Sequence, residues 1–288
     1  MTSTEAPSKA WTAWPPVHLL LTRLTLDHAM IGMMLVVIFT AAACTGMQSD
    51  TWWQLRSGQL IVQTGQVWKV DPFSSTAYGA PWPNHEWLAQ VSFYAVYVVA
   101  GLGGVVVLCA LIATATWAII YRLCAGPPRY RALLLLAAVV CHEIVWAVRP
   151  HMITLLLLAL TLLLIRQRRL HWLLPPLFLL WANLHGGVAI GGFVLLVATG
   201  TALVFQRRDF WRWCGITAAS ALATLVNPMG LGLWRFALSM FDHPETEYIQ
   251  EWLPPSLSWP LSYPFFILAI VWLGVLGLRW RRLRSFED

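Results

Sequence analysis

Long apolar runs alternate along this chain with short polar breaks. Residues 132–148 and 152–165 are nearly unbroken Ala, Leu and Val. An α-helix that crosses a membrane needs about 20 mainly apolar residues, whereas a membrane-spanning β-strand shows segments of about 10 residues with alternating polarity. The pattern therefore predicts the all-α class, in the form of a polytopic transmembrane helical bundle.

The apolar runs divide the chain into about eight or nine hydrophobic segments. One of them contains Pro175 and Pro176, which lack backbone donors and should kink or shorten their helix, so that segment is not expected to cross alone. The expected segments are 28–47, 86–101, 103–121, 132–148, 151–165, 172–183, 186–205, 213–226 and 262–279.

The polar breaks are short, so a single membrane domain is the simplest organisation. We expect this domain over 27–284, after an N-terminal cytoplasmic or interfacial segment over 1–26 and before a tail over 285–288. Two longer polar stretches, 50–88 and 227–260, are expected to be loops on the outer side.

Arginine clusters set the expected orientation, because loops rich in Lys and Arg stay in the cytoplasm. Four breaks carry such clusters, and the breaks between them then face outward, which brings the unusual polar residues of the chain to one side. The clusters are Arg122, Arg129 and Arg131; Arg166, Arg168 and Arg169; Arg207, Arg208 and Arg212; and Arg279, Arg281, Arg282 and Arg284.

The stretch 86–121 does not fit this alternation directly. An outward loop that ends at Glu86 and an inward loop at Arg122 require an odd number of crossings, while Gly101 to Gly104 indicates a hairpin. Either the two segments form one broken crossing with an interfacial half, or the Arg122 loop departs from the charge rule. Three other clusters agree in phase, so we favour the broken crossing.

Composition supports the membrane class, since 58% of residues are hydrophobic and 11% are charged. No phosphate-binding glycine loop, H-E-x-x-H or paired C-x-x-C motif is present, and the arginines lie in topology-setting loops rather than on a nucleic-acid-binding surface. Four of the five cysteines lie in apolar runs, as inert buried thiols do. At Cys44 the alternative is a lipoprotein cleavage site, which Ala41 disfavours.

Asp50, His85 and Glu86 are the first candidates for chemistry. Asp50 opens an amphipathic stretch, and as a single residue it is equally well explained as a helix N-cap. Glu86 precedes an apolar segment, where a carboxylate suits a helix N-terminus. Beside His85 at a membrane boundary, it could also hold a proton or a metal ion. Asp71 before Pro72 is better explained by a turn.

A second set of ionisable residues lies inside an apolar segment. His142 and Glu143 carry a cost of several kcal/mol unless they are paired or face the bundle interior. Arg149 is about two helical turns further on, so a structural pair of Glu143 with Arg149 is the simpler explanation. A pathway for transport across the bilayer is the alternative.

Several sequence fragments occur in a recognisable order over about residues 27–256. They resemble the C-type superfamily of membrane glycosyltransferases, and more closely a group of bacterial glycosyltransferase-like membrane proteins. Two departures are the absence of a second acidic residue beside Asp50 and the presence of Gln54 where His is expected. The fragments are D-T-W-W-Q-L-R-S-G-Q-L-I, D-P-F-S-S-T, N-H-E-W-L, V-R-P-H, N-L-H-G-G, L-V-N-P-M-G and I-Q-E-W.

The resemblance implies transfer of a sugar from a polyprenyl-phosphate carrier to a glycan, lipid or protein acceptor, at the outer face of a bacterial inner membrane. It places Asp50 at the catalytic centre, with Glu86 and His85 as further catalytic groups; these three are also the possible ligands of Mg²⁺ or Mn²⁺. The residues expected to bind substrate or its phosphate are Arg149, His151, Arg235, His185, Asn183, Asn227, Glu251, Trp52 and Trp53.

Two other functions remain open from the sequence. The chain could be a non-catalytic subunit or inactive relative that binds the lipid-linked substrate, or a transporter or flippase. Loss of function on replacing Asp50 favours an enzyme, whereas loss on replacing Glu143, with Asp50 dispensable, favours transport.

Overall fold

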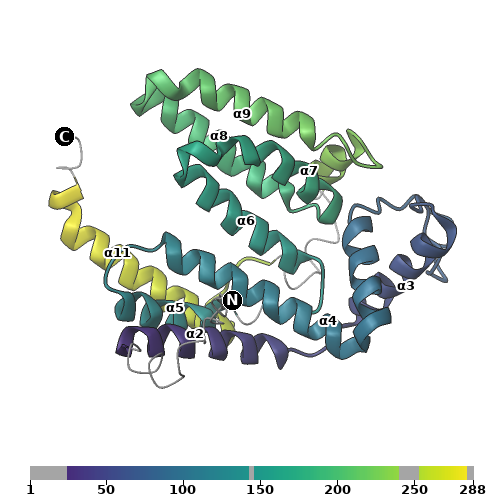
Figure 1. Cartoon of the computed structure of the whole chain (residues 1–288), viewed down its shortest axis with the longest axis horizontal. Helices are drawn as coiled ribbons and strands as arrows, with labels where there is room; N and C mark the ends of the chain where they lie inside the picture. Colours follow the sequence, from purple (N-terminus) through teal and green to yellow (C-terminus); the bar gives the residue numbers. More distant parts are fainter. Residues whose placement is uncertain (1–24, 143–145, 240–252, 284–288) are drawn as a thin grey trace, which may run out of the picture.

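The computed structural model describes residues 25–142, 146–239 and 253–283 (Figure 1). These residues are mostly helical and contain no strand, which confirms the all-α prediction. The α-helices are α2 (Leu26–Ala43), α3 (Ser49–Thr64), α4 (Trp87–Leu123), α5 (Pro128–His142), α6 (His151–Arg166), α7 (Leu174–Leu184), α8 (Val188–Phe205), α9 (Phe210–Ala223), α10 (Gly232–Ser239) and α11 (Tyr263–Leu283). Short 3₁₀-helices are η2 (Arg168–Leu173), η3 (Arg207–Asp209) and η6 (Pro260–Ser262).

Three described helices, α2, α4 and α8, are long and apolar enough to cross a membrane. Helix α6 and the Tyr263–Leu278 part of α11 are also apolar but shorter. Helix α7 has 11 residues and starts with its prolines in the first turn, where a missing N–H is tolerated. The expected shortening at Pro175 and Pro176 is therefore confirmed, while a bundle of eight or nine crossings is not.

The helices form two layers (Figure 1), with α2, α4, α5 and α11 in one and α6, α7, α8 and α9 in the other; α3 lies at one end. Helix α4 contacts α3, α2 and α6 and so joins the layers. One buried cluster lies between α2, α4 and α5 and includes Met34, Ile38, Ala113, Trp117 and Leu135. The other extends from α4 into the second layer and includes Val105, Leu157, Phe178, Trp181 and Leu195.

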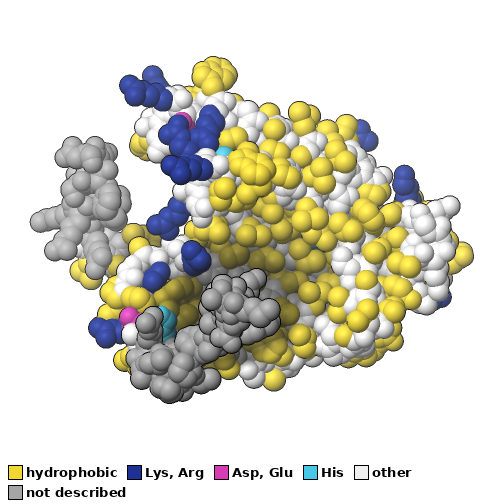
Figure 2. Space-filling view, viewed as in Figure 1, with side chains coloured by type: hydrophobic (Ala, Val, Ile, Leu, Met, Phe, Trp, Pro, Cys, Tyr) yellow, Lys and Arg dark blue, Asp and Glu magenta, His cyan; other side chains and the backbone are white. Residues whose placement is uncertain are grey.

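Arginines from separate loops meet at one end of the bundle. Arg166 donates to the carbonyl oxygen of Leu123 at 2.6 Å, and Arg168 lies 2.5 Å from the carboxylate of Asp209. Figure 2 shows Lys and Arg side chains gathered at this end of the visible face, beside a largely hydrophobic middle. The loop that follows Arg122 therefore lies at the same end of the bundle as the clusters at 166–169 and 207–212.

Helix α4 is broken at Gly101, where φ is 64° and ψ is −166°. Before the break it packs on α3 so closely that a Cβ at Gly58 would lie 2.1 Å from the carbonyl oxygen of Gln90. After the break it packs on α2. The two helical parts of α4 thus meet directly at the kink at Gly101, without a loop between them. The single broken crossing expected for this stretch stays a prediction.

Replacing Gly101 with Ala is expected to destabilise the protein by about 1–3 kcal/mol, because this combination of φ and ψ is essentially restricted to glycine. Gly103 is the matched control: it lies in the same helix, has ordinary φ, and has open space around its Cβ position. Gly103→Ala should be neutral or slightly stabilising. Denaturation of both variants in detergent tests this, and equal stabilities would contradict it.

Candidate functional site

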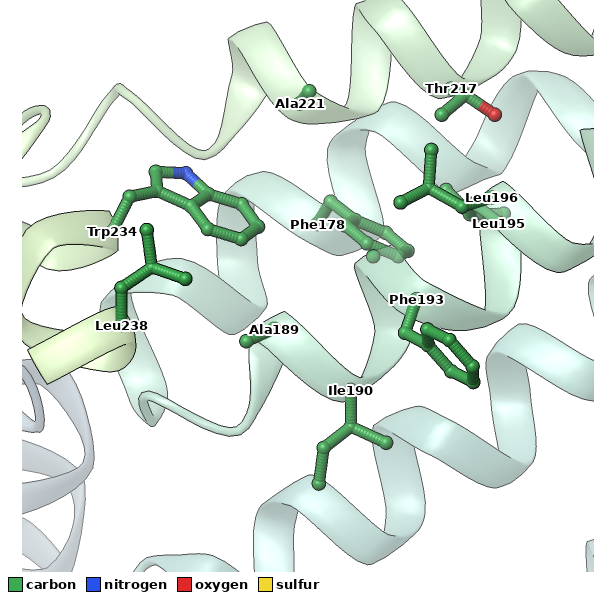
Figure 3. Close-up of a pocket in the computed structure, with 11 residues that line it drawn as sticks. Phe178, Ala189, Ile190, Phe193, Leu195, Leu196, Thr217, Ala221, Trp234 and Leu238 are labelled. Atoms are coloured by element: carbon green, nitrogen blue, oxygen red, sulfur yellow. The ribbon is translucent and has the colours of Figure 1, made fainter. Parts of the chain in front are cut away.

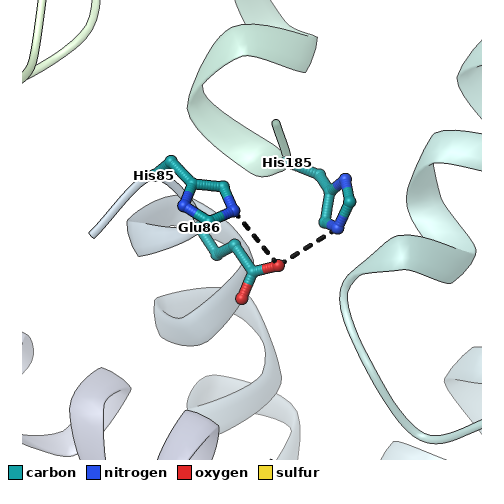
Figure 4. Close-up of side chains that lie close together, drawn as sticks. All are labelled: His85, Glu86 and His185. Carbon is teal, nitrogen blue, oxygen red and sulfur yellow. Dashed lines mark ion pairs between the residues drawn. The ribbon is translucent and has the colours of Figure 1, made fainter. Parts of the chain in front are cut away.

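The centre of the candidate site is the carboxylate of Glu86, the residue just before α4 (Figure 4). Its Oε1 atom lies 3.1 Å from Nε2 of His185 and 3.7 Å from Nε2 of His85. Its Oε2 atom accepts a hydrogen bond from the side-chain amide of Gln54 on α3. Three separated parts of the sequence thus converge on one carboxylate, whose side chain is only 12% exposed.

The two histidines have opposite tautomers, which are set by their backbone partners. The amide N–H of Gly187 donates to Nδ1 of His185 at 2.9 Å. That nitrogen therefore carries no proton, and Nε2–H points to Glu86. At His85, Nδ1 lies 3.0 Å from the carbonyl oxygen of Pro83. A carbonyl can only accept, so His85 is protonated at Nδ1 and, when neutral, presents a lone pair on Nε2 to Glu86.

Two glycines after His185 allow the close approach of its neighbours. A Cβ at Gly186 would lie 3.0 Å from the ring of His85, and one at Gly187 would lie 2.5 Å from the hydroxyl oxygen of Thr154. That hydroxyl lies 2.9 Å from Nδ1 of His185 and accepts from the indole N–H of Trp181. The two glycines of the N-L-H-G-G fragment are therefore explained by these close contacts, which leave no room for a larger side chain.

The protonation of the site is determined by burial and hydrogen bonding. Burial by itself raises the pKa of Glu86, but interactions with His185, then His85, then the hydrogen bond from Gln54 lower it, and the resulting pKa is about 2 instead of 4.5. Burial lowers the pKa of His85; Glu86 raises it, His185 lowers it and the bond to Pro83 raises it. At neutral pH Glu86 is therefore a carboxylate, and His85 favours the neutral form.

A second polar cluster lies at the start of α3. Oδ2 of Asp50 lies 2.7 Å from Nη2 of Arg149, and Oδ1 accepts a hydrogen bond from the indole N–H of Trp53 at 3.2 Å. Nη1 of Arg149 donates to Gln48. The N-cap of α3 is Gln48, so the explanation of Asp50 as an N-cap is wrong; Asp50 lies in the first turn, where a carboxylate is favourable.

Helix α3 connects the two clusters. Asp50 and Gln54 are four residues apart and therefore lie on the same face of the helix. The hydroxyl of Thr51 donates to the carbonyl oxygen of Val148 at 2.9 Å, which fixes the helix start against the segment that carries Arg149. Asp50 and Gln54, which contacts Glu86, are about one helical turn apart along α3. These polar residues therefore lie close together, and their outward orientation stays a prediction.

Asn183 and Asn227 have partners that organise the backbone. Asn183 accepts from the indole N–H of Trp87 at 2.9 Å and donates to the carbonyl oxygen of Val226 at 2.8 Å. Asn227 accepts from the backbone N–H of Met229 at 2.7 Å, within its own turn. Both amides hold turns beside the site and do not point to Glu86.

The remaining predicted residues lie around these clusters. His151 begins α6 and is half-buried; Trp52 is exposed on α3. Arg235 is exposed on α10, which also places Phe236 against His85, with ring centroids 4.7 Å apart. The predictions for Glu143 and Glu251 lie outside the described residues.

The donor set does not fit Mg²⁺ or Mn²⁺. The structure brings together His85, Glu86 and His185, with one donor atom of each within 4.8 Å of the others, while Asp50 pairs with Arg149 instead. Mg²⁺ and Mn²⁺ prefer carboxylate, carbonyl and water oxygens, and this group offers two imidazoles and one carboxylate. We therefore assign no role to Mg²⁺ or Mn²⁺ at this site.

Two cavities lie near the polar clusters. One cavity has a volume of about 350 Å³ and is lined by Trp53, Asp71, Phe73, Ser74 and Trp82. The other, of about 520 Å³, lies between α7, α8, α9 and α10, and its walls are almost entirely apolar (Figure 3). Among its residues are Phe178, Ile190, Phe193, Leu196, Trp234 and Leu238.

Gln54 and Thr154 are parts of the site that sequence analysis did not identify. Gln54 stands out in the sequence only as a departure from an expected His, although its spacing of four from Asp50 places it on the same helical face. Thr154 is three residues after His151 on α6, which likewise indicates a shared face. Spacing on a helix was the available signal in both cases.

The described residues form a helical protein with three helices that are long and apolar enough to cross a membrane. Its candidate site brings carboxylate, histidine and arginine side chains together around the start of α3 and the start of α4. Comparison of the chain with protein-family models, with curated proteins and with solved structures finds no match.

Proposed function

We propose that this chain is a membrane glycosyltransferase that moves a sugar from a polyprenyl-phosphate carrier to an acceptor hydroxyl at the outer face of a bacterial inner membrane. The observation that carries the proposal is the contact of Asp50 with Arg149, 2.7 Å between Oδ2 and Nη2. It brings a carboxylate and a phosphate-binding side chain together at the start of α3, just after the first apolar helix.

The exposure of the two carboxylates favours Asp50 as the base. Its side chain is 31% exposed, against 12% for Glu86, so an acceptor can reach Asp50 more easily. In the proposed reaction Asp50 takes the proton of the acceptor hydroxyl. The oxygen of that hydroxyl attacks the anomeric carbon of the sugar. The bond from that carbon to the phosphate oxygen breaks, and the electron pair leaves with the lipid phosphate.

Arg149 is the proposed partner of the departing phosphate. A guanidinium has five N–H donors, and Arg149 contacts Asp50 and Gln48 through its two terminal nitrogens. Arginine binds phosphate oxygens in pairs, through charge-assisted hydrogen bonds. One side chain thus positions the base and stabilises the charge that develops on the leaving group.

The two cavities suit the two parts of a lipid-linked sugar. The smaller one has Trp53 and Trp82 with ring centroids 5.6 Å apart, together with the polar side chains of Asp71 and Ser74; aromatic faces and a few polar groups are what a sugar ring requires. The larger cavity is apolar and suits part of the polyprenyl tail. Trp53 also donates to Asp50, which links the sugar cavity to the base.

We also propose a membrane topology for the chain. The shorter apolar helices complete a bundle of eight or nine hydrophobic segments, with the half of α4 before Gly101 lying at the membrane interface. The arginine-rich end faces the cytoplasm by the positive-inside rule. Asp50, Glu86 and Arg149 then face outward, where polyprenyl-linked sugars are used.

Mass spectrometry of polyprenyl-phosphate sugars in a host that lacks this gene tests the function. A lipid-linked sugar should accumulate without the gene and return to its normal level when the wild-type chain is restored. An unchanged lipid profile would contradict sugar transfer. Loss of complementation by Glu143→Gln, with full complementation by Asp50→Asn, would instead indicate transport.

A non-catalytic relative is the second candidate, and one observation favours it. Both oxygens of Asp50 already have protein partners, Trp53 and Arg149, as expected of a structural carboxylate. Such a protein would still bind the lipid-linked sugar, so the accumulation in the gene-deficient host would be relieved by Asp50→Asn as fully as by the wild type.

A further inference from the structure

We propose that His85, Glu86 and His185 bind one divalent transition-metal ion of the Zn²⁺ type, with Thr154 as the hydrogen-bond partner of a ligating histidine. This proposal does not depend on sugar transfer. Two imidazoles and one carboxylate, with a position left open, are a donor set that proteins use for Zn²⁺.

The spacing of the donor atoms suits a single ion. Ligands about 2.1 Å from a tetrahedral ion lie roughly 3.4 Å from one another. The distances from Oε1 of Glu86 to the two histidine nitrogens are 3.1 and 3.7 Å, one on each side of that value. All three donor atoms lie within 4.8 Å of one another, so small side-chain rotations would bring them around one ion.

A buried acceptor without a donor is the second observation. Gln54 is 2% exposed, and its amide nitrogen donates to Glu86, but its Oε1 atom has no hydrogen-bond partner among the described residues. Buried side-chain oxygens are nearly always satisfied, by protein or by bound water. A water on the open position of the ion supplies a donor of the kind that this oxygen lacks.

His85 already has the tautomer that a metal ligand needs. Its Nδ1–H is directed to the carbonyl oxygen of Pro83, and its Nε2 lone pair faces Glu86. A ligating histidine that donates its other N–H to a backbone carbonyl is the usual outer-shell arrangement. The ring is therefore oriented for binding before any ion arrives.

His185 must change tautomer, and Thr154 makes the change possible. In the structure Nδ1 of His185 accepts from Gly187, so the proton is on Nε2. When Nε2 binds the ion, the proton is carried by Nδ1 instead, and the net protonation of the ring is unchanged. The hydroxyl oxygen of Thr154, 2.9 Å away, then accepts from Nδ1–H, while the N–H of Gly187 loses its acceptor.

The test uses the full chain, purified in detergent, stripped with a chelator and equilibrated with Zn²⁺ or Co²⁺. One ion per chain is expected by elemental analysis, with the intense visible absorption of tetrahedral Co²⁺. His85→Gln and His185→Gln each remove one of three ligands and should lower the affinity by more than the roughly 10- to 100-fold loss that follows removal of an outer-shell partner. His28→Gln, which changes an exposed histidine at the start of α2, should have no effect.

Thr154 provides the sharper comparison. Thr154→Val should weaken binding by about 10- to 100-fold, the usual effect of losing an outer-shell partner. Thr161 is the matched control, because it is buried on the same helix and donates only to the carbonyl oxygen of Leu157. Thr161→Val should bind as the wild type does, and equal affinities for the two valine variants would overturn the role of Thr154.

The wild-type chain tests the proposal even if a variant does not fold. Zn²⁺ should raise its unfolding temperature, and Mg²⁺ should not. Absence of stoichiometric Zn²⁺ or Co²⁺ binding by the wild type would overturn the metal site and leave the lipid result untouched. Asp50→Asn should still bind the ion fully, so failure of sugar transfer and failure of the metal site are distinguishable.

Discussion

Asp50→Asn should lower the rate of sugar transfer by about 10²- to 10⁴-fold, the usual contribution of a general base. Asparagine keeps the size of the side chain and can still accept from Trp53, so the start of α3 should stay in place. It cannot take a proton from the acceptor hydroxyl, and it removes the charge that pairs with Arg149. The measurement is the transfer of labelled sugar from polyprenyl phosphate by membranes with matched amounts of each protein.

Asp209 offers a control with the same chemistry at the other end of the bundle. It also pairs with an arginine, Arg168, at 2.5 Å. Asp209→Asn removes the same charge and the same kind of contact, so it should keep wild-type transfer. Equal rates for the wild type and Asp50→Asn would exclude Asp50 as the base and favour the non-catalytic function. Equal losses in both asparagine variants would point to a general effect of losing an ion pair.

Glu86→Gln should remove a large part of the acid sensitivity of the fold. The folded-state pKa of Glu86 is about 2 against an ordinary value of 4.5. A lowered carboxyl pKa contributes stability that is complete above the ordinary value and is lost as pH falls towards the folded-state value. A difference of this size corresponds to about 3 kcal/mol.

The wild type should therefore be more stable than Glu86→Gln at pH 6, and the two should converge between pH 4.5 and 2. Denaturant unfolding in a non-ionic detergent, with a chelator present, measures this difference. Asp71→Asn is the control: the pKa of Asp71 is lowered too, first by the hydrogen bond from Ser74. Because that carboxylate is only partly buried, solvent screening should keep its contribution small. Parallel pH curves for the wild type and Glu86→Gln would contradict this account of Glu86.

Apolar periodicity was sufficient to predict the helical class and several helix positions. The run 186–205 corresponds to α8 (Val188–Phe205), and 151–165 corresponds to α6 (His151–Arg166). The break at Gly101 was harder to interpret, because a glycine pattern does not distinguish a hairpin loop from a kink. The number of crossings is a property of helix and bilayer together, and the sequence pattern describes only the helix.

The site was predictable in its location and less so in its pairings. Loop orientation brought Asp50, Glu86 and His185 to the same side, which the contacts of Glu86 with His185 and Gln54 support. The tautomers of the two histidines depend on backbone atoms of Pro83 and Gly187, whose positions no residue pattern indicates. The pairing of Asp50 with Arg149 likewise depends on the short segment before α6.

Glu86 lies at the far end of the part of α4 that precedes the kink at Gly101, so a change in the kink angle moves Glu86. About 14 residues separate Glu86 from Gly101, and at 1.5 Å per residue they form an arm of roughly 21 Å. Rotating this arm by about 10° would displace Glu86 by roughly 4 Å, which exceeds its 3.1 Å separation from His185. The contacts of Glu86 therefore require the bend at Gly101 to stay within a few degrees of its angle. The close packing of Gly58 on Gln90 holds the first part of α4 at that angle.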